Sequence, residues 1–573
     1  MPKQSITDPA AGAPGTRRST DRTDGAVPRP RGGAPGSSQP TSRTTAPGRR
    51  GPRAAVWLLG AVALGALLVR VSLTVGMDAD AANKALQGWD LLHGHLLLHG
   101  WITGDATFYA LESPVCALVE AFTGLSPLVM HVEPVLVYLL VLGLVLLLGR
   151  GYAVGWAAAL RALAAAAVLL VPLGSPYGIS LLIEQPDHVG TAAFLLAAFV
   201  LADRAGRWRP WVAPCAVLLV CTAGILSDDT VTYVAVPAIV VVCGLRILAE
   251  RRLSVTDAAV LLAAIAAIPL EHYVRLLMRL FGGYWMTRPA TQIAPSPTWP
   301  AHLHRTLRAV AALYGLTTSG SPWPVLAPVA LLGGCALGAA AAGFARVLWL
   351  WRETTRAEQL CAVAMVLNLA VYTLSTAHTP IPAHEVAAVL PLGAVLAARC
   401  VSPAWAWWRV PARRVCLVLA LAAVAPLAVS ALRPPEVPIP TAPAPALAGW
   451  LDRHGLRYGI AGYWDASTLT VDSGGAVRVR TVVRTREGFA MYAWETRQDW
   501  YLARLHDATF AVADDAPAAA DPIDADMLGS TDYEAFLGKP AEVYRVDGRT
   551  VLVYPGNLLD HVTVWLPARA KRE

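Results

Sequence analysis

Long runs of apolar residues without charges constrain this chain most, because they are too long and too apolar for an ordinary soluble core. They recur about eleven times between residues 54 and 432. A helix of about 20 apolar residues spans the hydrocarbon core of a bilayer and satisfies its own backbone hydrogen bonds there. Charged residues make up only 15% of the chain, against roughly 25% in soluble domains. The sequence therefore predicts an all-α polytopic membrane protein.

About eleven transmembrane helices are expected. The stretch 188–203 is short enough to be a tilted or partial span. The predicted segments are 54–76, 128–149, 153–173, 188–203, 211–227, 231–249, 255–271, 323–350, 358–375, 384–400 and 414–432.

Arginine in the short loops predicts the orientation. With the N-terminus in the cytoplasm, every predicted cytoplasmic loop carries arginine, as the positive-inside rule requires. These loops are 149–153, 202–211, 245–256, 349–358 and 400–415. The prediction is an N-in/C-out multi-pass protein of the cell membrane and cell envelope, with its unusual polar residues gathered at the outer face.

Three regions follow from composition. Residues 1–53 are rich in Pro, Gly, Ser, Thr and Arg and are predicted to be a disordered cytoplasmic tail. Residues 54–432 form the transmembrane domain. Residues 433–573 alternate helix-like and strand-like runs and are predicted to be an extracytoplasmic α/β domain. Within it, Asp547 and Gly548 indicate a hairpin turn between two strands.

Other features exclude several classes of protein. The net charge of +7 lies largely in the N-terminal tail and the short loops, so it indicates membrane orientation and no nucleic-acid partner. The eight cysteines show neither CxxC nor zinc-ligand spacing. No P-loop, GxSxG, HExxH or dinucleotide fingerprint is present, so nothing supports an ATP-driven pump or a soluble-type hydrolase.

The first outer loop, 77–127, is the richest in chemical groups. Asp78 and Asp80 follow the first helix, and their carboxylates could take a proton from a hydroxyl or bind a divalent cation. An acid-x-acid pair alone is a weak motif that occurs by chance in many loops, where it marks a solvated helix end. Asp105 and Glu112 follow in the same loop.

Further polar groups lie at the outer ends of other predicted helices. Asp187 and His188 occupy the second outer loop, and Ser-Asp-Asp-Thr fills 227–230. These acids could converge on one site, or each could cap its own helix. His384 and Glu385 begin the tenth segment and could contact a headgroup or mark a helix end.

The long predicted loop 272–322 interleaves Arg275, Arg279 and Arg288 with Tyr284 and Trp285. Arginine forks suit phosphate, while Trp and Tyr suit sugar stacking or the bilayer interface. Several arginines in an outer loop run against the positive-inside bias, which favours an anionic ligand.

The layout resembles the class C glycosyltransferases, polytopic enzymes that use polyprenyl-phosphate sugars as donors. The resemblance rests on the acids Asp78 and Asp80 after an N-in first helix, and on the runs AspAlaThrPheTyr (105–109) and GluSerPro (112–114). The tail run 458–467 also resembles accessory domains of bacterial relatives. The arrangement covers 54–432, although only short motifs match.

The resemblance implies sugar transfer from a lipid-linked donor to a glycan or protein acceptor at the outer membrane face. It implies that Asp78 is the catalytic base or holds a metal, supported by Asp80, with Asp105 or Glu112 positioning the acceptor. Arg275, Arg279 or Arg288 would neutralise the donor phosphate as it leaves. Asp78 and Asp187 would hold a divalent cation, Mg²⁺ or Mn²⁺. Asp78 is followed by Ala, not by a second acid, which departs from the better-known subgroups.

Two alternatives remain open at this point. A non-catalytic scaffold or lipid-glycan binding protein would keep the fold without the base. A transporter or flippase would place ionisable residues near the bilayer midplane and often shows two related halves. The C-terminal domain is expected to recognise the acceptor through aromatic side chains, which could equally fill its core. They are Tyr463, Trp464, Tyr492, Trp494, Trp500 and Tyr501.

Overall fold

The computed structural model describes nine stretches of the chain. They are residues 51–184, 188–250, 254–287, 292–316, 326–376, 382–401, 412–433, 445–515 and 528–564. The predicted disordered tail, 1–53, lies outside this part except for the first residues of α1.

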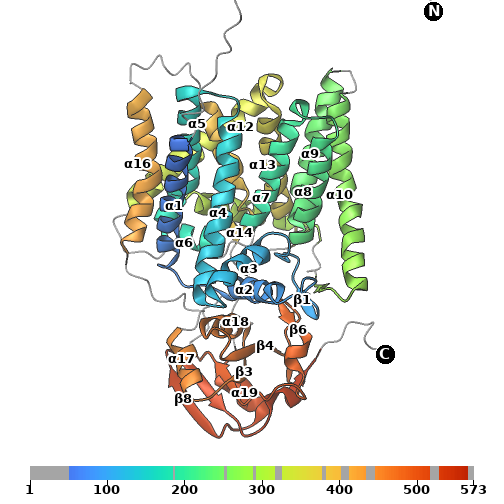
Figure 1. Cartoon of the computed structure of the whole chain (residues 1–573), viewed down its shortest axis with the longest axis vertical. Coiled ribbons are helices and arrows are strands. Elements are labelled where there is room, and N and C mark those ends of the chain that lie inside the picture. The colour runs from blue at the N-terminus through green and yellow to red at the C-terminus, as the bar shows by residue number, and fades with distance from the viewer. Residues whose placement is uncertain are drawn as a thin grey trace, which may run out of the picture. The chain divides into compact units, whose positions relative to one another are not determined.

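A helix lies in each of the eleven predicted segments (Figure 1). Within the described residues, seven helices are long and apolar enough to cross a membrane: α4 (Pro127–Arg150), α5 (Gly155–Leu170), α9 (Thr230–Glu250), α10 (Val255–Leu280), α12 (Leu326–Trp349), α13 (Arg356–Leu374) and α16 (Ala412–Ala431). Four are shorter in their described apolar part: α1 (Gly51–Ser72), α7 (Val189–Asp203), α8 (Val212–Ser227) and α15 (Val389–Cys400). The membrane class is confirmed, while the number of crossings and the orientation stay predictions.

One boundary was wrong in a way that matters for the site. The seventh segment was expected to end near residue 271, which would leave Arg275 and Arg279 in a loop. Instead α10 continues to Leu280. Glu271 and Arg275 form an ion pair one helical turn apart, and such pairs support a helix beyond its apolar part. The same expected loop also contains helix α11 (Trp299–Leu313).

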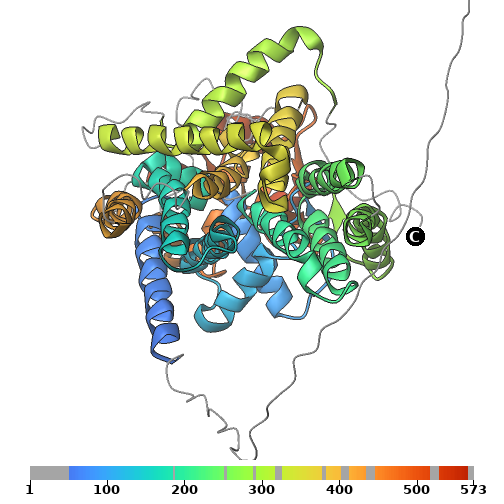
Figure 2. The ribbon, with the colours of Figure 1, turned by 90° about the horizontal axis from the view of Figure 1, so that it is seen from above.

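Small residues allow the long helices to approach closely. In α12, a Cβ on Gly343 would lie only 2.5 Å from the backbone oxygen of Leu396 in α15. A Cβ on Gly393 of α15 would lie 3.1 Å from the Cβ of Ala340. Packing between apolar helices in lipid depends on such close contact, since the hydrophobic effect gives little drive there. Figure 2 views the bundle from above, with α8 to α10 in green on one side and α16 in orange on the other.

The predicted first loop folds into two short helices and a strand. α2 (Ala79–Leu92) packs against α3 (Glu112–Thr123), and β1 (Trp101–Thr103) lies between them in sequence. α2 also packs against α18 (Tyr463–Asp472) of the C-terminal region. Figure 1 shows α2 and α3 between the long helices and the C-terminal strands. This segment therefore joins the two parts of the molecule.

The C-terminal region contains a seven-stranded mixed sheet, as an α/β domain requires. The strand order is β10-β5-β4-β3-β7-β9-β8. Its strands are β3 (Tyr458–Ala461), β4 (Arg478–Arg484), β5 (Phe489–Met491), β7 (Phe510–Ala513), β8 (Glu542–Val546), β9 (Arg549–Val553) and β10 (Val562–Thr563). Helices α17 (Pro445–Arg453), α18 and α19 (Ser530–Leu537) accompany it.

The predicted hairpin is confirmed. Val546 pairs with Arg549 across the two-residue loop Asp547–Gly548. Both loop residues have positive φ, 47° and 76°, which is the backbone that a type I′ turn needs and that Asp-Gly tolerates well.

Candidate active site

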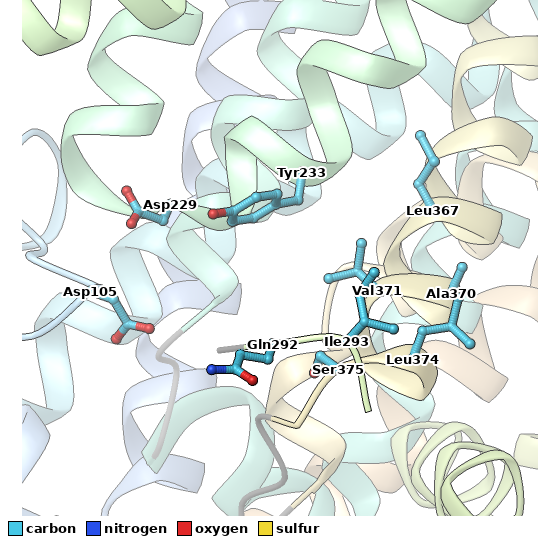
Figure 3. A pocket seen from close by; sticks show the side chains of 10 residues that line it. All are labelled: Asp105, Asp229, Tyr233, Gln292, Ile293, Leu367, Ala370, Val371, Leu374 and Ser375. Carbon is cyan, nitrogen blue, oxygen red and sulfur yellow. The ribbon is translucent and has the colours of Figure 1, made fainter. Parts of the chain in front are cut away.

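Two aspartates line a cavity of about 470 Å³ beside α13. Asp105 follows β1, and Asp229 lies between α8 and α9. Figure 3 shows their carboxylates on one side and the side chains of Leu367, Ala370, Val371 and Leu374 from α13 on the other. The cavity thus combines a charged wall with an aliphatic one.

A cluster of ionisable side chains from three segments lies near Asp105: His188, Asp228 and Glu385. Nδ1 of His188 lies 2.6 Å from a carboxylate oxygen of Asp228, and its Nε2 lies 3.4 Å from Glu385. Asp228 also accepts a hydrogen bond from Thr191 and one from the backbone N–H of Thr230. Flanking carboxylates favour the cationic form of the imidazole. Residues 188, 228 and 385 therefore lie close to one another. This agrees with the prediction that polar groups at the outer helix ends converge on one site.

This setting changes the acidity of Asp105. Burial raises the pKa of Asp105 to about 6, and the negative charges of Asp228 and Glu385 add to the increase, while His188 opposes it. A carboxylate with its pKa near the working pH suits proton transfer. Ala106 forms an isolated β-bridge with Asp228, which ties the Asp105 loop to the charged groups.

A second cavity, of about 580 Å³, shares Asp229 and Tyr233 with the first. Arg275 and Arg279 of α10 also line it. Arg275 is paired with Glu271 and lies 3.8 Å from Asp229, while the guanidinium of Arg279 lies 5.1 Å from the ring centre of Trp285. Two of the arginines expected near an anion therefore lie next to the acidic cavity.

The strand before Asp105 is held from both sides. β1 pairs in parallel with β2 (Trp285–Met286) and antiparallel with β6 (Thr496–Arg497) of the C-terminal region. The backbone N–H of Gly104 donates to Glu495 at 2.8 Å. A Cβ at residue 104 would lie 2.5 Å from the Trp494 ring, so a larger residue there would have to displace that ring. The C-terminal region thus fixes the backbone beside Asp105.

Asp78 and Asp80 lie elsewhere, at the start of α2. Asp78 is the N-cap of that helix, and its carboxylate accepts a hydrogen bond from the backbone N–H of Ala81 at 3.0 Å. Asp78 is buried, and Asp80 accepts a hydrogen bond from the hydroxyl of Tyr463. The structure thus gives both acids structural contacts. Their predicted catalytic roles stay predictions.

Glu112 is buried against α7, where a Cβ on Gly190 would lie 1.7 Å from its Oε1. Burial raises the pKa of Glu112 to about 8, and the charge of Glu133 adds to the increase. At neutral pH this carboxyl is therefore mostly protonated. Its role in binding the acceptor also stays a prediction.

Of the remaining candidate site residues, one lies near the Asp105 cavity and two fall outside the described residues. His384 lies beside the cluster of ionisable side chains, 3.8 Å from a carboxylate oxygen of Glu385, and its ring centre lies 6.0 Å from that of His188. Asp187 and Arg288 lie outside the described residues. Within the described part of the chain, no group of three or more His, Cys, Asp and Glu residues is arranged to hold a metal ion. The divalent cation therefore stays a prediction.

Sequence reasoning missed Tyr233, Gln292 and Glu495. Tyr233 sits inside an apolar run, and Gln292 lies in a loop without a motif. Glu495 lies 390 residues beyond Asp105, in the C-terminal region. Nothing local in the sequence marks any of them.

No protein-family model and no curated protein matches the sequence. The crystal structure of ArnT from Cupriavidus metallidurans bound to undecaprenyl phosphate is similar, with a TM-score of 0.51 and 13% identity. The match covers 87% of this chain and 98% of that one.

The chain shares its fold with ArnT. The ArnT structure in the apo state gives a TM-score of 0.50 at 13% identity, over 90% of this chain and all of that one. Since ArnT is a class C glycosyltransferase, the expected class C architecture is confirmed. At this low identity the likeness establishes the fold alone.

Proposed function

We propose that this protein is a membrane glycosyltransferase that moves a sugar from a polyprenyl-phosphate donor to a glycan or protein acceptor. The fold shared with ArnT supports this class of protein, and the comparison structure holds undecaprenyl phosphate. We further propose eleven crossings with the N-terminus inside and the C-terminal domain outside. The arginine-bearing loops support this orientation.

The cavity of Asp105 and Asp229 carries the proposal. Its aliphatic wall, formed by α13, suits a prenyl chain or the edge of the bilayer, whereas its acidic wall suits a reacting hydroxyl. The neighbouring arginines supply positive charge for a phosphate. An amphiphilic donor needs this combination within one connected region.

In the proposed mechanism, Asp105 is the general base. Its carboxylate takes the proton from the acceptor hydroxyl as that oxygen forms a bond to the anomeric carbon of the donor sugar. The bond from that carbon to the phosphate oxygen breaks, and its electron pair leaves with the polyprenyl phosphate. Arg279 and Arg275 stabilise the negative charge that grows on this phosphate in the transition state.

Asp78, supported by Asp80, remains the competing assignment for the base. Mg²⁺ or Mn²⁺ held by Asp78 and Asp187 is proposed on the family resemblance alone. Asp105 is preferred because it lines the cavity and has a pKa near neutrality, whereas Asp78 caps α2.

Sugar transfer by purified protein in liposomes tests the function. A panel of polyprenyl-phosphate sugars is offered with cell-envelope glycan as acceptor, and protein-free liposomes serve as the control. Transfer of label from one donor supports the proposal. Tight donor binding without any turnover would instead indicate the non-catalytic binding protein, and movement of unreacted lipid between leaflets would indicate a flippase.

The rate should depend on pH through Asp105. A base must be deprotonated to act, so kcat/KM for the acceptor should rise with pH through about 6 and level off above 7. At pH 5 the rate should be about a tenth of the plateau, as expected for one group with that pKa. A profile that is flat from pH 5 to 8, measured with saturating lipid donor, would rule out Asp105 as the base.

A further inference from the structure

A third cavity, of about 340 Å³, lies between the first loop and the C-terminal region. Leu86, Trp89 and Asp90 of α2 line one side. From the C-terminal region come Arg478 and Arg480 of β4, with Arg497, Asp499, Trp500 and His506. This cavity shares no lining residue with the two cavities described above.

The cavity contains positive charge that its own acids do not neutralise. Three arginines and two aspartates line it. Arg497 lies 2.6 Å from Asp90 and 2.6 Å from Asp499, so one arginine binds both acids. Arg478 and Arg480, the other two arginines of the cavity, form no ion pair with these two aspartates.

Arg480 is the residue that points to a ligand. Its side chain is only 6% exposed, and its Nη1 has no hydrogen-bond partner among the described residues. Its Nε donates to the hydroxyl of Tyr458 at 3.3 Å. A buried donor without a partner costs free energy, so it is expected to bind something that the protein itself does not supply.

Aromatic rings hold this guanidinium in place. Its carbon lies 3.7 Å from the ring centre of Trp500 and 5.6 Å from that of Tyr458. The rings of Tyr458 and His506 stack at 4.5 Å. Trp89 lines the facing wall. Arginine stacked on aromatic rings is pre-organised for a two-oxygen anion, and flat rings also suit the apolar face of a sugar.

We propose that this cavity binds an anionic saccharide, with the carboxylate or phosphate group on Arg480 and the sugar ring against Trp89 and Trp500. That the saccharide is part of the acceptor rests on the proposed function. The wall of the cavity continues toward the candidate base. Trp101 of β1 packs edge-on against Trp500 at 5.1 Å and donates to Asp90, and Asp105 follows two residues after β1.

The aromatic residues expected to recognise the acceptor therefore divide. Trp500 lines this cavity, whereas Tyr501 and Tyr463 are buried and Tyr501 belongs to the hydrophobic core of the domain. For Tyr501 the alternative of core packing holds, whereas the hydroxyl of Tyr463 donates to Asp80 of α2.

Binding to the full-length protein in nanodiscs tests the site. The probes are trigalacturonate and mannose 6-phosphate, with the methyl ester of trigalacturonate and free mannose as neutral partners. Wild type should bind at least one anionic probe at least ten-fold more tightly than its neutral partner, with affinity falling as salt rises. Equal binding of charged and neutral probes, or no binding of either anion, would overturn the proposal.

Variants on one strand make the test specific. Arg480→Gln should weaken binding at least ten-fold, and Arg478→Gln, at an exposed residue of the cavity rim, about three-fold. The matched control is Arg484→Gln at the end of β4, where the arginine is 60% exposed and pairs with Asp532. Unchanged binding in both Arg480→Gln and Arg478→Gln would contradict the proposal even if one of them were poorly folded.

Polyprenyl-phosphate binding, measured on the same preparations, separates this inference from the proposed function. If Arg480→Gln still binds polyprenyl phosphate but no longer binds the anionic saccharide, the saccharide site is separate from the donor site. If the wild type does not bind polyprenyl phosphate, the proposed function is wrong, while saccharide binding at this cavity would still be supported.

Discussion

Replacing Asp105 with asparagine should lower sugar transfer by about 10²- to 10⁴-fold, the usual contribution of a general base. Asparagine has the same shape but cannot accept the proton of the acceptor hydroxyl. Asp105 lines the cavity, and its carboxylate needs no ion pair to stay in place, since its Oδ1 accepts from the N–H of Ala106. Donor binding should therefore change little. The measurement is the single-turnover rate in liposomes, together with the donor Kd.

Asp78→Asn is the matched control, because asparagine caps helices as well as aspartate does. The hydrogen bond from the N–H of Ala81 should survive, so α2 should keep its start. Transfer within about three-fold of wild type is expected, as for a residue outside the chemical step. If Asp78→Asn loses transfer while Asp105→Asn keeps it, the base is Asp78 and not Asp105.

Replacing Gly343 with alanine should destabilise the bundle by about 1–3 kcal/mol, the usual cost of overpacking. The new Cβ would lie 2.5 Å from the backbone oxygen of Leu396 and 2.9 Å from its Cβ. Neither atom belongs to the flexible end of a side chain, so α12 and α15 must move apart. The measurement is the melting temperature of the purified protein in detergent.

The control for this substitution lies on the same helix. Gly338 has nothing within 4 Å of the position that a Cβ would take. Gly338→Ala should leave the melting temperature unchanged or raise it, since alanine favours a helix over glycine by up to about 1 kcal/mol. Equal melting temperatures for the two alanine variants would show that the close contact of α12 with α15 does not limit stability.

The features that were predicted correctly, the long helices and the hairpin, depend on residues near one another in the sequence. Apolar runs located every long helix, because a span depends on its own composition. Asp547-Gly548 located a hairpin, because both residues tolerate positive φ. The end of α10 was missed, since polarity signals the membrane boundary but does not by itself stop a helix.

The candidate site was predicted only in part, and the reason is geometric. Asp105 was named as a contact for the acceptor because the first-loop motif drew attention to it, yet its chemical setting comes from His188, Asp228 and Glu385. No sequence pattern relates those three positions. Asp78 and Asp80 were the expected base and its support, and the structure places Asp78 at the N-cap of α2 and Asp80 in its first turn.

The sequence by itself determined the membrane class, the helical segments and the presence of an α/β region, because each depends on local composition and spacing. Only the tertiary structure decided which polar groups share a cavity. That outcome depends on how α7, α8, α13 and the first loop pack, and on β6 pairing with β1 across almost 400 residues of chain. Contacts between such distant segments arise from complementary shape and charge, which the order of residues along the chain does not display.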